Sequence, residues 1–425
     1  MSSANTKNNL IDNQPQVERV LIVGVHTQDV TDLMFQTLMD EMASLTETAG
    51  GKVISRVQQN LERVDSRTLV GKGKLQEIQT LVNSQDIDTV IFLNDLKPIV
   101  NRNLEETLNV KVIDRVQLIL DIFALRARSS EGKLQVSLAQ YEYLLPRIIG
   151  KGKTLSRLGA GIGTRGPGET KLESDRRHIR NNIHRIKEQL KDVEKHRDLT
   201  RQNRLQGKDY RIGLIGYTNA GKSTILEQLS GQETYVKDQL FATLDPLTRE
   251  FEIGGQDLFT ITDTVGFIES LPTQLIHAFK STLQEISHVD LLLHVVDASH
   301  PARMIHEQTV KQLIKQLEMD HIPQLTVYNK ADLLDQPVEA SLFPYVAISA
   351  HKEADINKLK QVIKQECQEL SQHYDMMLPA LQAHQLHKYQ QTTLMESLEF
   401  DESLNAYHIT GYEKNSHNIG GNHHD

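Results

Sequence analysis

Eight residues, 216–223, combine glycine, lysine and serine at the spacing needed to hold the phosphates of a nucleotide. Their sequence is GYTNAGKS, and its glycines let the backbone turn N–H groups toward phosphate oxygens. Lys222 can reach the terminal phosphates, and the hydroxyl of Ser223 can bind Mg²⁺. We expect an apolar strand at 210–215 and a helix from Thr224, whose N-terminal end adds partial positive charge. Strand, loop and helix together predict a phosphate-binding loop.

Two later segments supply groups that can respond to the last phosphate of a nucleotide. Asp263 follows an apolar strand expected at 258–262, and Gly266 comes shortly after it. This order suits an acidic side chain that contacts the ligands of Mg²⁺ rather than the ion itself, and a backbone N–H near the γ-phosphate. Thr243 lies between this segment and the phosphate loop, where it can close on Mg²⁺ and the γ-phosphate.

A third segment, with the sequence NKAD at 329–332, predicts selectivity for guanine. The carboxylate of Asp332 can accept both the ring N–H and the exocyclic amine of guanine. Adenine offers no such pair of donors, and an unpaired buried carboxylate costs free energy, so this segment favours GTP over ATP. Ser349 and Ala350 follow the next expected strand, where a backbone N–H can meet the guanine carbonyl.

The segments described above contain the residues expected to act in catalysis, to bind Mg²⁺ and to contact GTP. The residues expected to act in catalysis are Lys222, Thr243, Asp263 and Gly266. Ser223 and Thr243 are expected to bind Mg²⁺, with Asp263 behind them. The expected GTP contacts are Gly216, Tyr217, Thr218, Asn219, Ala220, Gly221, Lys222, Ser223, Thr224, Phe241, Ala242, Thr243, Leu244, Asp245, Asp263, Thr264, Val265, Gly266, Asn329, Lys330, Ala331, Asp332, Ser349 and Ala350.

Most of these segments stand at the ends of expected strands, which predicts an α/β fold over 209–370. The sheet should be mostly parallel, with helices on both faces. Five such segments in this order closely resemble the G domain of translation-factor-type GTPases, a P-loop fold. An alternation of strands and helices over 16–128 predicts a second, smaller α/β domain before it. There the sequence GKGK at 71–74 can hold an anion or form a simple turn before a helix.

Residues 129–208 predict an antiparallel helical hairpin with a glycine-rich, basic tip. The first helix is stopped by Pro146, and the sequence TKLE from Thr170 matches a capping box at the start of the second. The tip contains GxGxxG, but no strand is expected before it, and the sequence PG at 167–168 is expected to interrupt any helix behind it. A dinucleotide site is therefore rejected.

The formal net charge of the chain is −9, yet the hairpin is basic. Between 147 and 187 there are eleven Lys and Arg residues against three acidic ones. Such an excess favours RNA, through sequence-independent attraction to phosphates; a solvated linker with ordinary charges is the alternative. The expected RNA contacts are Lys151, Lys153, Arg157, Arg165, Arg176 and Arg177.

Composition limits the remaining possibilities. The 425 residues suffice for several domains, and no apolar run of about 18 residues suggests a membrane span. A polar start without a signal sequence and a single cysteine, Cys367, fit the cytoplasm. No Cys/His spacing suggests zinc. The histidines near the end, His417, His423 and His424, are expected to lie in a disordered tail, with metal binding as the alternative. Residues 1–15 are also expected to be disordered, and 371–425 to form a small segment with strands at 373–381 and 411–412 around a helix at 382–398.

The chain resembles the HflX-type ribosome-associated GTPases. The likeness spans about 17–370 and is thin after Ser371. It is carried by TAGG at 48–51, DRVQLILDIFA at 114–124, EGKLQV at 131–136, LAQ at 138–140, and segments 161–170, 216–224 and 241–246. The resemblance implies a cytoplasmic GTPase that binds the large (50S) ribosomal subunit and its rRNA, with Mg²⁺ as cofactor. It also implies a part in ribosome splitting or rescue, recycling or biogenesis, and an ATP-dependent RNA-remodelling activity of the N-terminal part.

Three functional classes stay open: a ribosome-directed GTPase, a signalling GTPase without ribosome binding, and an NTP-driven RNA remodeller. The basic hairpin and the resemblance favour the first, acting as a monomer away from membranes. Phe267 stands where many small GTPases carry a glutamine that orients water. Because its ring cannot accept a hydrogen bond, intrinsic GTP hydrolysis should be slow, and a ribosomal partner should supply or order the missing group.

Overall fold

The computed structural model describes residues 17–150, 167–205, 209–232, 240–241, 246–263, 266–269 and 286–414. The chain divides into two compact units. The first consists of Met1–Val30 and Met39–Leu118, and the second of Thr31–Leu38 and Ile119–Asp425. No helix within the described residues is long and apolar enough to cross a membrane.

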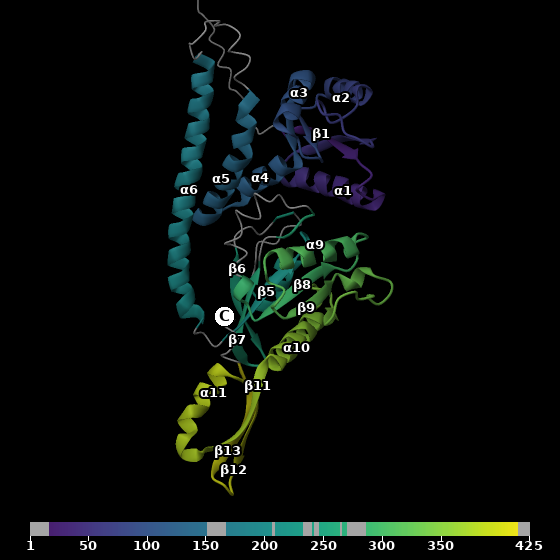
Figure 1. Cartoon of the computed structure of the whole chain (residues 1–425). Helices are drawn as coiled ribbons and strands as arrows, with labels where there is room; N and C mark the ends of the chain where they lie inside the picture. The colour runs from purple at the N-terminus through teal and green to yellow at the C-terminus, as the bar shows by residue number, and fades with distance from the viewer. Residues whose placement is uncertain are drawn as a thin grey trace, which may run out of the picture. The chain divides into compact units, whose positions relative to one another are not determined.

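The first unit has a four-stranded sheet in the order β2-β1-β3-β4, with every pair parallel. The two central strands, β1 and β3, are nearly continuous apolar runs because both of their faces are buried, whereas the edge strand β2 is largely exposed or half-buried. The predicted small α/β domain with a parallel sheet is thus confirmed (Figure 1). The elements are β1 (Arg19–His26), β2 (Lys52–Asn60), α2 (Lys72–Ser84), β3 (Thr89–Phe92), α3 (Pro98–Leu108) and β4 (Lys111–Asp114), with α1 (Asp32–Thr48) and α4 (Arg115–Arg126) divided between the units.

The GKGK segment forms the start of α2. Gly71 is the N-cap of this helix, and its N–H donates to Oε1 of Gln59 at 3.0 Å. Of the two alternatives for the GKGK segment, the structure shows the simple glycine turn before a helix.

The hairpin consists of α5 (Ser130–Leu144), the 3-10 turn η1 (Leu145–Gly150) and α6 (Pro167–Leu205). Lys187 and Glu142 join the two long helices with an ion pair of 2.8 Å. The predicted start of the second helix at Thr170 is wrong, since α6 begins at Pro167. Proline suits the first turn, where its missing N–H would have no helical partner. Pro167 therefore opens the helix, and only the sequence before the glycines still argues against a dinucleotide site.

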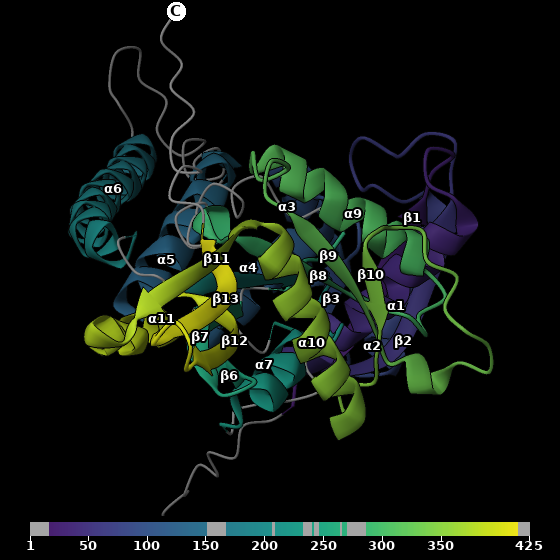
Figure 2. The same cartoon turned by 90° about the horizontal axis from the view of Figure 1, so that it is seen from below.

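The G domain has a six-stranded sheet in the order β10-β9-β8-β5-β7-β6, in which only the β6–β7 pair is antiparallel. Helices α7 and α10 cover one face and α9 the other (Figure 2), which confirms the expected fold class. The elements are β5 (Tyr210–Gly216), α7 (Lys222–Ser230), β6 (Leu247–Ile253), β7 (Gln256–Asp263), η3 (Ile286–His288), β8 (Leu291–Asp297), α9 (Arg303–Gln316), β9 (Gln324–Asn329), η4 (Ala331–Leu333), β10 (Tyr345–Ala347) and α10 (Glu353–Glu369).

A three-stranded antiparallel sheet in the order β11-β13-β12 follows the G domain. The helix predicted over 382–398 is too long, because Thr393 is extended and residues from Leu394 pair with β13. Half-buried and exposed side chains alternate over residues 395–398, as in a half-exposed strand. The elements are β11 (Ser371–Pro379), η5 (Ala380–Gln385), α11 (Leu386–Thr392), β12 (Leu394–Asp401) and β13 (Ala406–Lys414).

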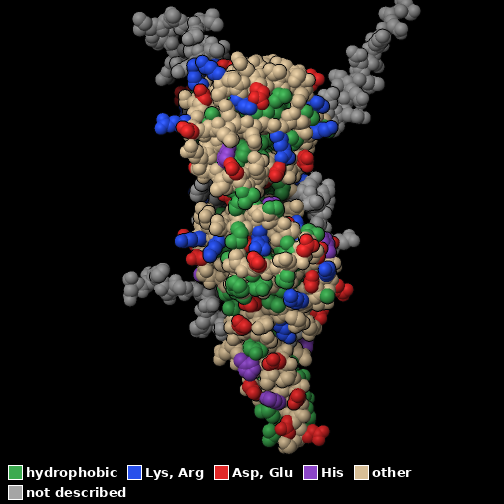
Figure 3. Space-filling model, turned by 90° about the vertical axis from the view of Figure 1, so that its right-hand side faces the viewer, with side chains coloured by type: hydrophobic (Ala, Val, Ile, Leu, Met, Phe, Trp, Pro, Cys, Tyr) green, Lys and Arg blue, Asp and Glu red, His purple; other side chains and the backbone are tan. Residues whose placement is uncertain are grey.

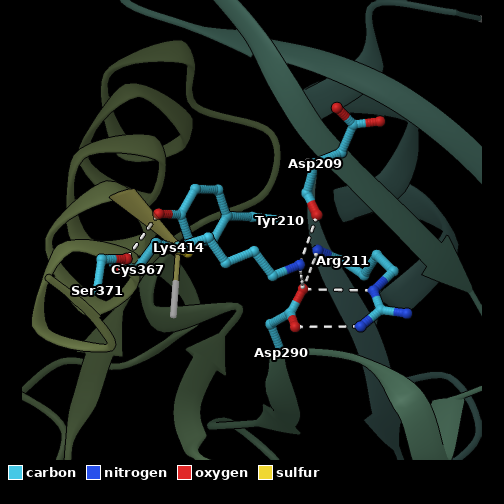
Figure 4. Close-up of polar contacts among 7 residues, drawn as sticks. All are labelled: Asp209, Tyr210, Arg211, Asp290, Cys367, Ser371 and Lys414. Carbon is cyan, nitrogen blue, oxygen red and sulfur yellow. Dashed lines mark hydrogen bonds and ion pairs between the residues drawn. The ribbon is translucent and has the colours of Figure 1, made fainter. Parts of the chain in front are cut away.

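Polar contacts fasten this sheet to the beginning of β5 (Figure 4). Lys414 donates from Nζ to Oδ2 of Asp290 at 2.7 Å and to the carbonyl oxygen of Asp209 at 2.8 Å. The hydroxyls of Tyr210 and Ser371 are 2.6 Å apart, and burial raises the pKa of Tyr210 to about 12. The last strand is therefore held against the G domain by buried or half-buried groups.

The C-terminal sheet is acidic, unlike the hairpin. Acidic and histidine side chains are prominent at the lower end of Figure 3. Residues 371–414 contain two lysines, Lys388 and Lys414, and six acidic residues: Asp375, Glu396, Glu399, Asp401, Glu402 and Glu413. Because Lys414 is turned toward Asp290, this sheet offers little attraction for the phosphates of RNA.

Candidate nucleotide-binding site

The carboxyl ends of four parallel strands bring the predicted segments together. Strands β7, β5, β8 and β9 are neighbours in the sheet and end at Asp263, Gly216, Asp297 and Asn329. In an open α/β sheet, ligands bind at this edge of the strands. The fold therefore places the ends of these four strands at one edge of the sheet, as the sequence pattern predicts.

Two glycines of the phosphate loop are required by close contacts. A Cβ atom on Gly216 would lie 2.3 Å from the carbonyl oxygen of Val295. Gly221 has φ +94°, and a Cβ atom there would lie 2.1 Å from Nδ2 of Asn329. Any side chain at either position would collide with an adjacent strand end, so the loop can keep its path only with glycine.

The side chain of Asn329 links two segments of the site through hydrogen bonds. Its Nδ2 donates to the carbonyl oxygen of Ala220 at 2.9 Å, and its Oδ1 accepts the N–H of Ala350 at 3.0 Å. The side chain is buried. Asn329 therefore connects the phosphate loop with the segment of Ser349 and Ala350, a positioning role that the sequence pattern does not reveal.

Lys222 lies at the first turn of α7 and bends back over the loop. Its Nζ donates to the carbonyl oxygens of Gly216 at 3.0 Å and Tyr217 at 2.9 Å. Burial lowers the pKa of Lys222 to about 8, and nearby Asp263 acts in the opposite direction. The loop carbonyls thus hold the ammonium group against the glycine-rich loop.

Ser223 and Asp263 supply oxygen atoms next to this ammonium group. The hydroxyl of Ser223 donates to Oδ2 of Asp263 at 2.6 Å, and Asp263 is fully buried at the end of β7. Hydroxyl and carboxylate oxygens are ligands that Mg²⁺ prefers, which makes this pair a suitable donor set for the ion.

The segment after Asp263 is bound to the phosphate loop through its backbone. The N–H of Phe267 donates to the carbonyl oxygen of Gly216 at 3.1 Å, and the N–H of Thr218 donates to the carbonyl oxygen of Phe267 at 2.7 Å. A Cβ atom on Gly266 would lie 2.8 Å from Cγ2 of Thr218 and 3.1 Å from Nζ of Lys222. The Phe267 ring is buried, so it does not project into solvent to orient a water molecule.

Asp332 lies in η4 with an exposed side chain. Lys330 before it has φ +60°, and its Nζ pairs with Oδ2 of Asp297 at 2.7 Å. The backbone N–H groups of Ser349 and Ala350 already have protein acceptors, Asp355 and Asn329. The expected bond from this segment to the guanine carbonyl stays a prediction, and it requires Ala350 to share or exchange its acceptor.

Asp297 is a residue of this edge that the sequence pattern did not reveal, although an acidic residue directly after the apolar part of β8 was a signal for it. Burial would raise its pKa, but hydrogen bonds from Lys330 and Ser299 hold that pKa below its ordinary value. Asp297 therefore stays ionised and holds the side chain of Lys330 in place through the ion pair.

Several predicted site residues lie outside the described residues: Ala242, Thr243, Leu244, Asp245, Thr264, Val265, Lys151, Lys153, Arg157 and Arg165. Phe241 is described and buried, with φ +57° and its ring edge-on to Phe123 at 4.6 Å between centroids. Arg176 and Arg177 lie on α6, the first half-buried and the second exposed. Of the six expected RNA contacts, these two are the ones that the structure describes.

Two buried histidines of the G domain predict a loss of stability in mild acid. Burial lowers the pKa of His294 to about 4, assisted by Lys222, and burial lowers that of His306 to about 4, assisted by His300. Their ordinary pKa is 6.5, so between pH 6.5 and about 4 the unfolded chain binds more protons than the folded one. Stability is therefore complete above about pH 6.5 and decreases as the pH falls, by about 1 kcal/mol per histidine between pH 7.5 and 5.5.

Urea unfolding followed by circular dichroism at these two pH values measures the loss. Replacing His306 with Gln should remove about half of the pH dependence. Equal unfolding midpoints at both pH values would contradict the assignment.

Comparison with known proteins gives related sequences along most of the chain. Residues 36–124 match the family described as GTP-binding GTPase N-terminal, 126–204 the GTP-binding GTPase Middle Region, and 211–330 the 50S ribosome-binding GTPase. The GTPase HflX of Alkalihalophilus pseudofirmus is 47% identical over 400 residues, 94% of each chain. The GTPase HflX of Escherichia coli is 40% identical over 329 residues, 77% of this chain and 76% of the relative.

A solved structure supports the fold alone. The crystal structure of SsGBP in complex with GDP covers 83% of this chain and 99% of its own, with a TM-score of 0.50 and 23% sequence identity.

Proposed function

Because the chain belongs to the HflX family of GTPases and hydrolyses GTP, we propose that this hydrolysis controls its attachment to the large (50S) ribosomal subunit. The observation that carries the proposal is the match of 211–330 to the 50S ribosome-binding GTPase family, directly after a basic hairpin. The work proposed for it is ribosome splitting or rescue, recycling or biogenesis, in the cytoplasm.

In this proposal each residue of the site has a distinct task. Lys222 neutralises charge on the transferring phosphoryl group, and the N–H of Gly266 faces the γ-phosphate. Ser223 and Thr243 would hold Mg²⁺, with Asp263 behind them; when bound, the ion offsets the charge that develops on the β- and γ-oxygens. Asp332 selects guanine by accepting two hydrogen bonds.

GTP binding would hold the segments around Thr243 and Gly266 in one arrangement, and hydrolysis would release them. Phe267 offers no hydrogen-bond acceptor to water, and its ring is buried. Free protein should therefore turn over slowly, with the missing group supplied or ordered by the ribosomal subunit.

The hairpin is the proposed contact with rRNA. Replacing Lys151, Lys153, Arg157 and Arg165 with Ala should weaken binding to 50S subunits and flatten its dependence on salt, because each lost phosphate contact lowers the log–log slope by roughly 0.7–0.9. The measurement is co-sedimentation with purified subunits between about 50 and 200 mM salt, a range over which several phosphate contacts are readily detected. It is repeated with a GTP analogue, with GDP and without nucleotide.

A matched control removes four exposed lysines of the G domain: Lys311, Lys315, Lys352 and Lys358. Both variants lose four positive charges, so only a localised contact distinguishes them. Wild-type affinity of the hairpin variant at every salt concentration, or an equal loss in the control, would rule out the rRNA contact. Binding that ignores the nucleotide would rule out its control by GTP.

A further inference from the structure

Tyr217, in the phosphate loop, has an aromatic contact on α9. Its ring lies parallel to the imidazole of His306, with centroids 3.7 Å apart and 11° between the planes. Both side chains are buried, Tyr217 at 6% and His306 at 8% exposure. The phenol ring therefore has a fixed orientation, set by a helix that follows the loop by about ninety residues.

The hydroxyl of Tyr217 reaches the segment that carries Gly266. It accepts the backbone N–H of Glu269 at 2.8 Å, and the carboxylate of Glu269 in turn accepts the hydroxyl of Thr309 on α9. The phosphate loop, α9 and residues 266–269 are thus connected through the phenol of Tyr217 and the carboxylate of Glu269.

Together with the backbone bridge at Phe267, this bond fixes residues 266–269 at two points. Phe267 pairs with Gly216 and Thr218 on one side of the loop, and Glu269 is held by the Tyr217 side chain. A short segment held at Phe267 and again at Glu269 has little freedom to rotate, which is the condition for presenting a preorganised N–H to a developing charge.

We propose that Tyr217 is a positioning residue for GTP hydrolysis, holding residues 266–269 in register with the phosphate loop through its hydroxyl. The His306 ring orients the phenol, and Thr309 secures Glu269 from the same helix. Since the hydroxyl points to Glu269 and the side chain is buried against α9, its removal should affect the chemical step more than the binding of GDP.

The test is Tyr217→Phe in the full chain, which keeps the ring and its stacking and removes only the hydrogen bond. The kcat for GTP should fall about three- to tenfold, the range expected from the loss of one hydrogen bond, while the Kd for GDP stays within about twofold. Hydrogen exchange of peptides covering 266–269 should become faster, because the amide of Glu269 loses its acceptor.

The matched control is Tyr328→Phe. Tyr328 is also buried, and its hydroxyl accepts the N–H groups of Ser341 at 3.0 Å and Leu342 at 3.3 Å, away from the phosphate loop. This variant should leave kcat unchanged. Unchanged kcat and unchanged exchange in Tyr217→Phe, or equal losses in both variants, would overturn the proposal. No ribosome is present in the assay, so this outcome is independent of the proposed subunit binding.

Discussion

Replacing Lys222 with Ala is expected to reduce the affinity for GDP and GTP by at least about a hundredfold and to remove measurable hydrolysis. Charge-assisted hydrogen bonds contribute about 1.5–3 kcal/mol each, and a lysine in this position can make one to each of two phosphates. The sum of about 3–6 kcal/mol corresponds to factors of about 10² to 10⁴ in affinity. The effect on hydrolysis should be larger, since the charge on the phosphoryl oxygens changes in the transition state.

The geometry supports this size of effect. The ammonium group of Lys222 is buried, and two loop carbonyls hold it in place before any nucleotide arrives. Its orientation is therefore set in advance, so little side-chain entropy is lost on binding.

Isothermal titration with GDP and a GTP analogue measures the affinity, and phosphate release measures hydrolysis. Lys358→Ala, an exposed lysine on α10, is the control and should behave as wild type. Circular dichroism establishes that the Lys222 variant is folded. A folded variant with affinity within a few-fold of wild type would show that the phosphates bind elsewhere.

Replacing Asp332 with Asn is expected to weaken GDP binding by about ten- to a thousandfold and to relax discrimination against other bases. Asn is nearly isosteric, but its amide presents one acceptor and one donor where guanine offers two donors. The lost hydrogen bond costs about 0.5–1.5 kcal/mol, and the donor that faces another donor costs about 1–3 kcal/mol more. Xanthosine diphosphate carries a carbonyl in place of the amine, so its affinity should rise.

The exposure of Asp332 makes this a clean experiment, because the substitution should leave the fold intact. Asp335→Asn, three residues further along and also exposed, removes the same charge as a control. Competition of GDP, ADP and xanthosine diphosphate against a fluorescent nucleotide measures selectivity. Unchanged preference for GDP over ADP in the Asp332 variant would refute its assignment to the base.

The sequence by itself determined the α/β fold class and indicated the edge of the sheet where the nucleotide segments meet. This was possible because the phosphate loop has a local sequence pattern, two glycines five residues apart followed directly by Lys222 and Ser223. The central strands could be predicted in the same way, because continuous apolar runs are typical of strands in a buried parallel sheet. The GTPase family could also be predicted, since its segments occur in a fixed order along the chain.

Local patterns failed where two structures fitted the same residues. Residues 394–398 suit a helix as well as a strand, and pairing with β13 decided in favour of the strand. Pro167 can end one element or begin the next, and α6 begins there. In the first case the outcome depends on a neighbouring strand, which residue spacing does not specify. In the second it follows from the preference of proline for the first turn of a helix.

The tertiary structure alone decided how the site is braced. Asn329 donates a hydrogen bond to Ala220, which precedes it by 109 residues. Tyr217 stacks on His306, which also lies far from it in the sequence. Such contacts arise because adjacent strand ends and a covering helix converge on one edge of the sheet. No periodicity encodes them: packing brings these side chains together only after the chain has folded.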